Sequence, residues 1–158
     1  GLDAPSDGVV RFEGEDIVTT GYSRHRREHV SLVFQDHNLI DYLTPEENLR
    51  LVNPKADMKI LEDLGLSREE SKRNIMHLSG GQRQRVAVGR ALVAPGRAIL
   101  ADEPTGSLDP EMTDEVIDLL RHAAHQLGKC VIVVTHSKRV ADSADAVYTL
   151  RHKKLAKA

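Results

Sequence analysis

Two adjacent carboxylates, Asp102 and Glu103, directly follow the apolar segment 98–101. In a parallel sheet, the carboxyl end of such a strand opens onto the ligand crevice. One carboxylate there can hold Mg²⁺ through water, and the next can orient or deprotonate an attacking water. A strand that ends in Asp-Glu also arises for purely structural reasons, so the pair by itself leaves both interpretations open.

A second candidate is the run Ser79-Gly80-Gly81-Gln82, which has the spacing of a helix start. Two glycines allow another group to approach the backbone closely. The free N–H groups and partial positive charge of a helix N-terminus suit a phosphate group. The same residues also make an ordinary helix cap, and this run alone does not separate the two interpretations.

Two further polar residues follow apolar segments. His136 comes after Thr135 and the segment 130–134, and Gln35 comes after the segment 30–33 and Phe34. A histidine can donate a hydrogen bond to a phosphate oxygen, and a glutamine can coordinate a metal or position water. Each is weak evidence alone, since a histidine at a strand end is usually incidental. His122 and His125 lie three residues apart, but no third ligand nearby supports a metal site.

The elements that must position these residues follow an alternating pattern. Strand, helix and strand in this order predict a parallel βαβ unit and an α/β fold. The apolar, β-branched segment 130–134 is typical of a strand covered on both faces. Strands or a hairpin are predicted over 8–17, 30–34, 98–101, 130–134 and 147–150. Helices are predicted from Thr44-Pro45, over 58–64, from Ser67, from Ser79 to Val93 and from Asp109 to Gly128.

Bulk composition excludes several classes of function. The 158 residues fit one domain, and the formal net charge of −2 provides no basic field for nucleic acid. Aromatic residues make up only 3%, which leaves little for base stacking. The single cysteine, Cys130, permits no disulfide within the chain. No apolar stretch approaches the roughly 20 residues that span a bilayer, so a membrane role requires a partner. The tail 151–158 is expected to be a solvated end, with a membrane-surface contact as the alternative.

Taken together, five motifs resemble those of ABC-type ATPases, in the family's order and with similar spacing. Gln35 resembles the Q-loop glutamine, 78–85 (LSGGQRQR) the signature, 99–103 the Walker B strand, 107–109 the D-loop, and His136 the switch histidine. The resemblance extends from Gly1 to about Leu155. It implies a P-loop-NTPase-like ABC ATPase core with a mostly parallel sheet and an α-helical subdomain. The chain 1–158 would be one partial domain, with a helical and signature subdomain at about 36–95.

The resemblance also implies residue roles. Glu103 would be the general base, His136 would steady the γ-phosphate of ATP, and Gln35 would sense metal and membrane partner. Asp102 and Gln35 would hold Mg²⁺. The cofactor-binding residues would be Ser79, Gly80, Gly81, Gln82 and Asp109. The implied partners are a second ATPase domain, paired head to tail around ATP, and a transmembrane permease at the cytoplasmic face of the membrane. Nucleic acid is not among them.

The sequence departs from this family in one respect. A P-loop requires Gly-x-x-x-x-Gly-Lys-Ser/Thr, and the only Gly-Lys pair, Gly128-Lys129, is followed by Cys130. We therefore expect an N-terminally truncated piece of a longer ATPase that is inactive alone; the alternative is a degenerate, nucleotide-independent interaction module.

The finer placement rests on short segments. Leu43-Thr44-Pro45-Glu46-Glu47-Asn48 and Val134-Thr135-His136-Ser137 are similar to the exporter branch with lipoprotein-releasing, macrolide-efflux and peptide-exporting ATPases. The expected function is thus the energy-coupling subunit of an exporter. DNA-repair and translation relatives usually carry long coiled-coil or linker insertions, and none is evident.

Overall fold

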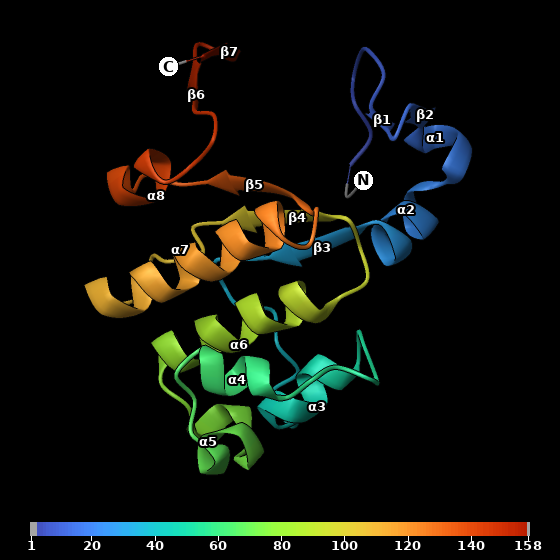
Figure 1. The fold of residues 1–158 in the computed structure, drawn as a ribbon. Coiled ribbons are helices and arrows are strands. Elements are labelled where there is room, and N and C mark those ends of the chain that lie inside the picture. The colour runs from blue at the N-terminus through green and yellow to red at the C-terminus, as the bar shows by residue number, and fades with distance from the viewer. Residues whose placement is uncertain (1–2, 158) are drawn as a thin grey trace.

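A three-stranded parallel sheet forms the centre of the computed structural model, which describes residues 3–157 (Figure 1). Its strands are β3 (Val30–Val33), β4 (Ala98–Asp102) and β5 (Cys130–Val134), in the order β3-β4-β5. The register pairs Val33 with Ala101 and Ala101 with Val133. The predicted parallel βαβ unit and the α/β class are therefore confirmed.

Two long helices cover one face of this sheet (Figure 1). They are α6 (Gly80–Val93), which lies against β3, and α7 (Pro110–His125), which lies against β5. Their buried apolar side chains form one cluster with the sheet, and each fully buried aliphatic side chain contributes about 1.5–3 kcal/mol. The cluster includes Val33, Val86, Val88, Ile99, Ala101, Val116 and Leu120. Its position fixes where the sheet ends relative to the start of α6.

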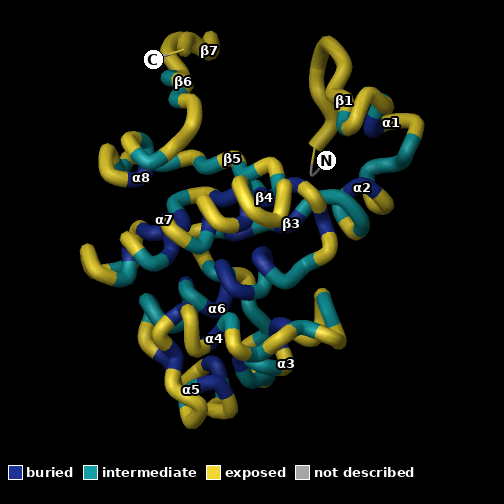
Figure 2. Tube along the Cα trace, viewed as in Figure 1, coloured by how far each residue is buried: buried dark blue, intermediate teal, exposed yellow. Residues whose placement is uncertain are grey.

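The other face of β5 is exposed, which corrects the expectation that both faces are covered. Along the strand, Cys130, Ile132 and Val134 are exposed, and Val131 and Val133 are half-buried. Figure 2 shows this alternation along β5. Because successive side chains of a strand point to opposite faces, a continuous apolar segment supplies both faces even where only one is packed.

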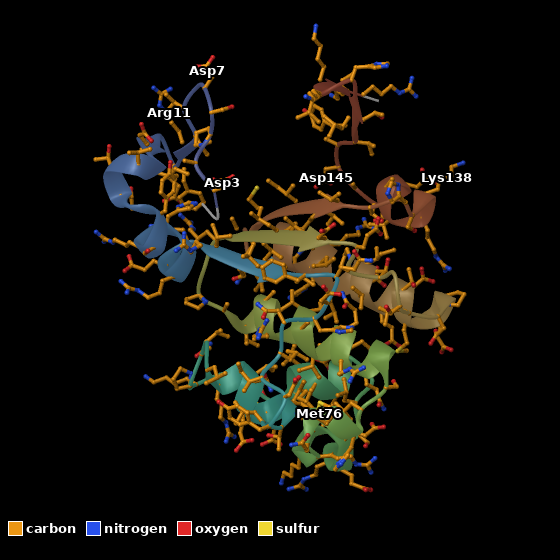
Figure 3. The ribbon with its side chains drawn as sticks, turned by 180° about the vertical axis from the view of Figure 1, so that it is seen from behind. Asp3, Asp7, Arg11, Met76, Lys138 and Asp145 are labelled. Atoms are coloured by element: carbon orange, nitrogen blue, oxygen red, sulfur yellow. The ribbon has the colours of Figure 1, made fainter. Side chains whose placement is uncertain are left out.

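Short helices form a lobe on the far side of α6 (Figure 1). They are α3 (Pro45–Arg50), α4 (Lys59–Asp63), α5 (Arg68–Lys72) and the 3₁₀ turn η1 (Ile75–His77). Helices α3 and α5 begin at the predicted positions, and capping boxes at Thr44 and Ser67 stabilise their first turns. Leu49, Leu61 and Leu64 are fully buried beneath these helices. Figure 3 shows Met76 on this lobe, at the opposite end of the molecule from Asp3, Asp7 and Arg11.

The two ends of the chain form small antiparallel hairpins. Near the N-terminus, β1 (Arg11–Phe12) pairs with β2 (Glu15–Asp16), so the predicted hairpin is confirmed but shorter. Helices α1 (Ile17–Thr20) and α2 (Tyr22–Glu28) follow it. After β5 come α8 (Lys138–Asp142), β6 (Tyr148–Arg151) and β7 (Lys154–Lys157).

The described part of the tail is exposed, as expected of a solvated end, and Lys154–Lys157 also pairs with β6 as strand β7. Gly1 and Leu2, where the family resemblance begins, and Ala158, the last residue of the tail, lie outside the described residues. Along the described part of the chain, no helix combines the length and apolar character that a membrane crossing requires.

Candidate functional site

Three of the predicted site segments meet at the carboxyl edge of the central sheet. Gln35 lies two residues beyond β3, Glu103 directly follows β4, and His136 lies two residues beyond β5. Because the three strands are parallel and in register, their carboxyl ends lie along one edge. The sheet thus gathers side chains that are up to about a hundred residues apart in sequence.

Glu103 is held in a specific orientation at this edge. Its backbone N–H donates to the carbonyl of Val134 at 2.9 Å. Its carboxylate accepts hydrogen bonds from Oγ1 of Thr135 at 3.0 Å and from the backbone N–H of His136 at 2.6 Å. Its φ of 45° lies in the left-handed region, which non-glycine residues rarely adopt. Such a backbone persists only where surrounding contacts impose it, and the contacts from the end of β5 are among them.

Three other polar side chains at this edge are exposed and make no hydrogen bonds or ion pairs with the described residues. Gln35, Asp102 and His136 are exposed. Within residues 3–157, none of the three side chains makes a hydrogen bond or an ion pair. Asp102 presents a carboxylate and Gln35 an amide oxygen, and oxygen is the donor that Mg²⁺ prefers. Groups of three or more His, Cys, Asp or Glu that could hold a metal are absent from the described residues.

The predicted phosphate-contacting turn lies at the start of α6. Ser79 caps the helix: its Oγ accepts from the N–H of Gln82 at 3.2 Å, and Oε1 of Gln82 accepts from the N–H of Ser79 at 2.8 Å. Gln82 also donates to Glu70 at 2.5 Å. Gly80 has open space where a Cβ would lie. The turn is therefore a rigid cap with an accessible backbone.

Gly81 brings this turn against the segment that follows Glu103. A Cβ on Gly81 would lie 3.3 Å from the carbonyl oxygen of Ser107 and 3.5 Å from a methyl carbon of Leu108. Asp109, two residues after Ser107, caps α7, since its Oδ1 accepts from the N–H of Met112 at 2.9 Å. The structure therefore places the 79–82 turn and the 107–109 segment side by side within one chain.

Three residues that were not predicted from the sequence as site residues also make hydrogen bonds that hold the site together. The hydroxyl of Thr135 reaches Glu103. The buried Gln84 donates to the carbonyl of Pro104 at 3.0 Å. Arg90 donates to the carbonyl of Asn38 at 2.7 Å and so ties the segment after Gln35 to α6. Gln84 had one sequence signal, because it lies four residues before Val88 on the buried face of a helix.

His37 lies close to the same helix start. Burial lowers the pKa of its imidazole, the nearby Arg83 guanidinium lowers it further, and Asp36 and the backbone of Gly80 act in the opposite direction. Its Nε2 is buried and has no hydrogen-bond partner. His37 is therefore part of the packing between the segment after β3 and the start of α6.

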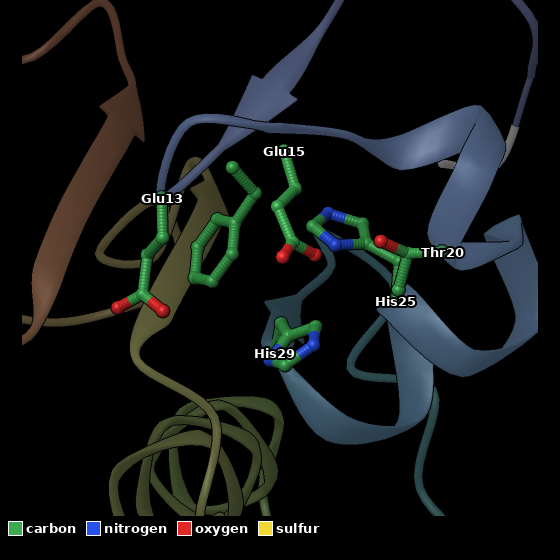
Figure 4. Close-up of a pocket in the computed structure, with 6 residues that line it drawn as sticks. Glu13, Glu15, Thr20, His25 and His29 are labelled. Atoms are coloured by element: carbon green, nitrogen blue, oxygen red, sulfur yellow. The ribbon is translucent and has the colours of Figure 1, made fainter.

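A small cavity of about 160 Å³ lies elsewhere, at the N-terminal hairpin. Its lining residues are Phe12, Glu13, Glu15, Thr20, His25 and His29 (Figure 4). His25 packs edge-on against Phe12, with ring centroids 5.2 Å apart. Because His29 immediately precedes β3, this cavity lies beside the amino end of the strand. It is separate from the carboxyl edge that carries Glu103.

Comparison with known proteins bears on this arrangement. The family model described as "ABC transporter" matches residues 1–106. An uncharacterized ABC transporter ATP-binding protein, YclH of Bacillus subtilis, is 36% identical over 155 residues, which are 92% of this chain and 69% of YclH. The macrolide export ATP-binding/permease protein MacB of Escherichia coli K12 is 37% identical over 95% of this chain. The chain spans about a quarter of the length of that protein.

Two solved structures have the same fold. The dimeric structure of MJ0796, described as a bacterial ABC transporter cassette, matches with a TM-score of 0.83 and 32% identity. It covers 93% of this chain and 70% of the other. A post-hydrolysis state of the ATP-binding cassette MJ0796, bound to ADP and Pi, matches with a TM-score of 0.86 and 30% identity. That match covers 99% of this chain and 75% of the other.

Proposed function

The chain belongs to the ABC transporter family as an ATP-binding cassette domain. From this premise we propose that it is part of an ATPase that drives an exporter. The chain would supply the carboxyl edge of the sheet, where ATP is hydrolysed, and the signature turn 79–82. The proposal is carried by one observation. The carboxylate of Glu103 is held between the end of β4 and the Thr135-His136 segment, on a sheet edge that also presents Gln35 and Asp102.

Within this proposal Glu103 is the general base. Its carboxylate accepts a proton from a water molecule as the water oxygen attacks the γ-phosphorus of ATP. The bond from that phosphorus to the bridging oxygen breaks, and ADP leaves with the electron pair. His136 donates a hydrogen bond to a γ-phosphate oxygen, and its exposed, unengaged imidazole is free to do so. Gln35 positions the water or the metal.

Mg²⁺ fits the donors at this edge. Asp102 and Gln35 provide one carboxylate and one amide oxygen, and Mg²⁺ commonly takes one or two protein oxygens together with water and phosphate oxygens. When bound, the ion neutralises charge that develops on the phosphate oxygens. Asp102 is exposed and makes no other polar side-chain contact with the described residues, so it can serve as such a ligand.

The signature turn acts on nucleotide held by a second ATPase domain. Ser79, Gly80, Gly81 and Gln82 present a helix N-terminus whose backbone N–H groups suit the γ-phosphate. Asp109 lies in the segment beside this turn and couples the two sites of a head-to-tail dimer. The related MJ0796 cassette has a dimeric structure, which supports this arrangement.

The helical lobe within 36–95 is the proposed docking surface for a transmembrane permease. Its exposed apolar side chains include Tyr42, Leu51 and Met76. Figure 3 shows Met76 on this lobe. Docking there places the domain at the cytoplasmic face of the membrane. Relatives named for macrolide export support a role in export.

The 158 residues contain no P-loop motif, so the phosphate cradle of a complete ATP site must come from other residues. This observation also favours the second candidate, a degenerate module that interacts without nucleotide. The two candidates predict opposite results for the full-length gene product that contains these residues.

ATP hydrolysis and ATP binding are therefore measured on the 158-residue chain and on the full-length gene product. We expect no measurable hydrolysis by the chain alone and Mg²⁺-dependent hydrolysis by the full-length protein. A full-length protein that neither binds nor hydrolyses ATP would instead establish the nucleotide-independent module.

A further inference from the structure

We propose that Gln84 is a positioning residue that couples the 79–82 turn to Glu103 within the same chain. This inference rests on the proposed function, because it concerns the same carboxylate. Gln84 lies on α6, one helical turn beyond the start that carries the signature, and contacts the residue immediately after Glu103.

The contact is buried and direct. Gln84 is 1% exposed, and its Nε2 donates to the carbonyl oxygen of Pro104 at 3.0 Å. Pro104 is itself buried. A buried amide without a partner is costly, so this hydrogen bond holds the two segments at a fixed separation.

A second contact connects α6 to the same segment. Gly81 lies against the carbonyl of Ser107, at a distance that leaves little room for a Cβ. Between the two contacts the segment is closed by its own hydrogen bonds, from Gly106 N–H to Glu103 O and from Leu108 N–H to Thr105 O, each 3.1 Å. We therefore expect the segment 103–108 to move together with α6 as one unit.

The opposite side of Glu103 is tied to β5, through its N–H to Val134 O and through its carboxylate to Thr135 and His136. Glu103 thus lies between the segment 104–108, which contacts α6, and the end of β5. Its left-handed φ of 45° depends on both sides. A shift of α6 when the signature turn meets phosphate then changes the backbone of Glu103 and the aim of its carboxylate.

The test uses Gln84→Met, which keeps the length of the side chain but removes the N–H donor, and Gln84→Glu, which places an acceptor opposite the Pro104 carbonyl. The control is Val88→Ala, a truncation on the buried face of the same helix, because the valine side chain has no hydrogen-bonding group that could hold 103–108. In the full-length gene product we expect both Gln84 variants to lower kcat about tenfold or more, with the KM for ATP unchanged within about twofold. Val88→Ala is expected to lower Tm without this fall in kcat.

A second measurement does not depend on turnover. Hydrogen exchange of the peptide covering 103–108 is followed in the 158-residue chain, and Gln84→Met is expected to accelerate it while Val88→Ala leaves it close to wild type. Wild-type turnover in both Gln84 variants, or unchanged exchange at 103–108, would overturn the inference. A wild-type full-length protein without ATPase activity overturns the proposed function instead, and the exchange result still decides whether Gln84 holds the segment.

Discussion

The hydroxyl group of Thr135 connects Glu103 to Ser137 at the carboxyl edge of the sheet. It donates to Oε2 of Glu103 at 3.0 Å and accepts from the backbone N–H of Ser137 at 3.0 Å. Ser137 in turn caps α8. The orientation of the Glu103 carboxylate is therefore connected, through a single hydroxyl, to the backbone that carries His136. Thr135 and the backbone of His136 therefore both orient the Glu103 carboxylate.

Replacement of Glu103 by glutamine tests its proposed role as base. Glu103→Gln keeps the shape and the acceptor oxygen but cannot take up a proton, so turnover by the full-length protein should fall about 10²–10⁴-fold while ATP binding persists. Turnover and nucleotide affinity are measured separately. Glu111→Gln, which removes an exposed carboxylate in the first turn of α7, is the matched control. Unchanged turnover in Glu103→Gln would remove Glu103 from this role.

Thr135 can be tested with a pair of substitutions. Thr135→Val is nearly isosteric but loses the hydrogen bond to a charged acceptor, a contact worth about 1.5–3 kcal/mol. We expect turnover to fall about tenfold or more. Thr135→Ser restores the hydroxyl and should recover most of the activity. Equal turnover in the valine and serine variants would show that the hydroxyl does not orient Glu103.

Two serines with the same capping geometry separate stability from nucleotide contact. Ser79 and Ser67 each accept a hydrogen bond of 3.2 Å from the N3 backbone of their helix. Alanine at either position should lower the free energy of unfolding by about 1 kcal/mol, as loss of a helix cap does. In the full-length gene product, only Ser79→Ala is expected also to weaken the ATP-dependent pairing of two ATPase domains. Sedimentation with and without ATP distinguishes them; equal pairing by both variants would contradict the phosphate-contacting role.

Gly96 is required by a close approach of two backbone segments. A Cβ there would lie 2.9 Å from the carbonyl carbon and oxygen of His29, just before β3. Backbone atoms cannot move aside as a flexible side chain can, so Gly96→Ala should lower the free energy of unfolding by about 1–3 kcal/mol. Urea unfolding measures the change. Gly80→Ala, where no heavy atom lies within 4 Å of the new Cβ, should not show a loss of this kind.

Stability should fall in mildly acidic solution, and His25 is one of the two histidines, with His37, whose burial-lowered pKa causes this. Burial lowers the pKa of this imidazole below 6.5, and the neighbouring His29 lowers it further. The unfolded chain therefore binds a proton before the folded chain does. The contribution of neutral His25 to the free energy of unfolding is fully present above about pH 6.5. It is lost as the pH falls through the pKa of His25 in the folded protein.

His25→Phe keeps an aromatic ring to pack on Phe12 and should reduce the dependence of Tm on pH below 6.5. The exposed His122 of α7, replaced by glutamine, is the control and should retain the wild-type slope. A wild-type slope in His25→Phe would place the acid sensitivity elsewhere.

Local signals predicted most of the elements correctly. The Ser-x-x-Glu and Thr-x-x-Glu spacings marked the starts of α5 and α3, because a capping box depends only on residues three apart. Strand β7 was missed, since this short exposed segment forms a strand only through its pairing with β6, which composition does not encode. The exposed face of β5 was also missed, because a continuous apolar segment does not say which side is packed.

The sequence by itself determined the family, the parallel βαβ order and the identity of the polar residues at the strand ends. Only the tertiary structure decided which of them touch. Glu103 meets Thr135 and His136, thirty-two and thirty-three positions later, because β4 and β5 lie in register. Gln84 reaches Pro104 because α6 packs across the same sheet. Spacing along the chain encodes helices and caps, whereas contacts between elements depend on how buried faces fit together, and that fit is a property of the folded core.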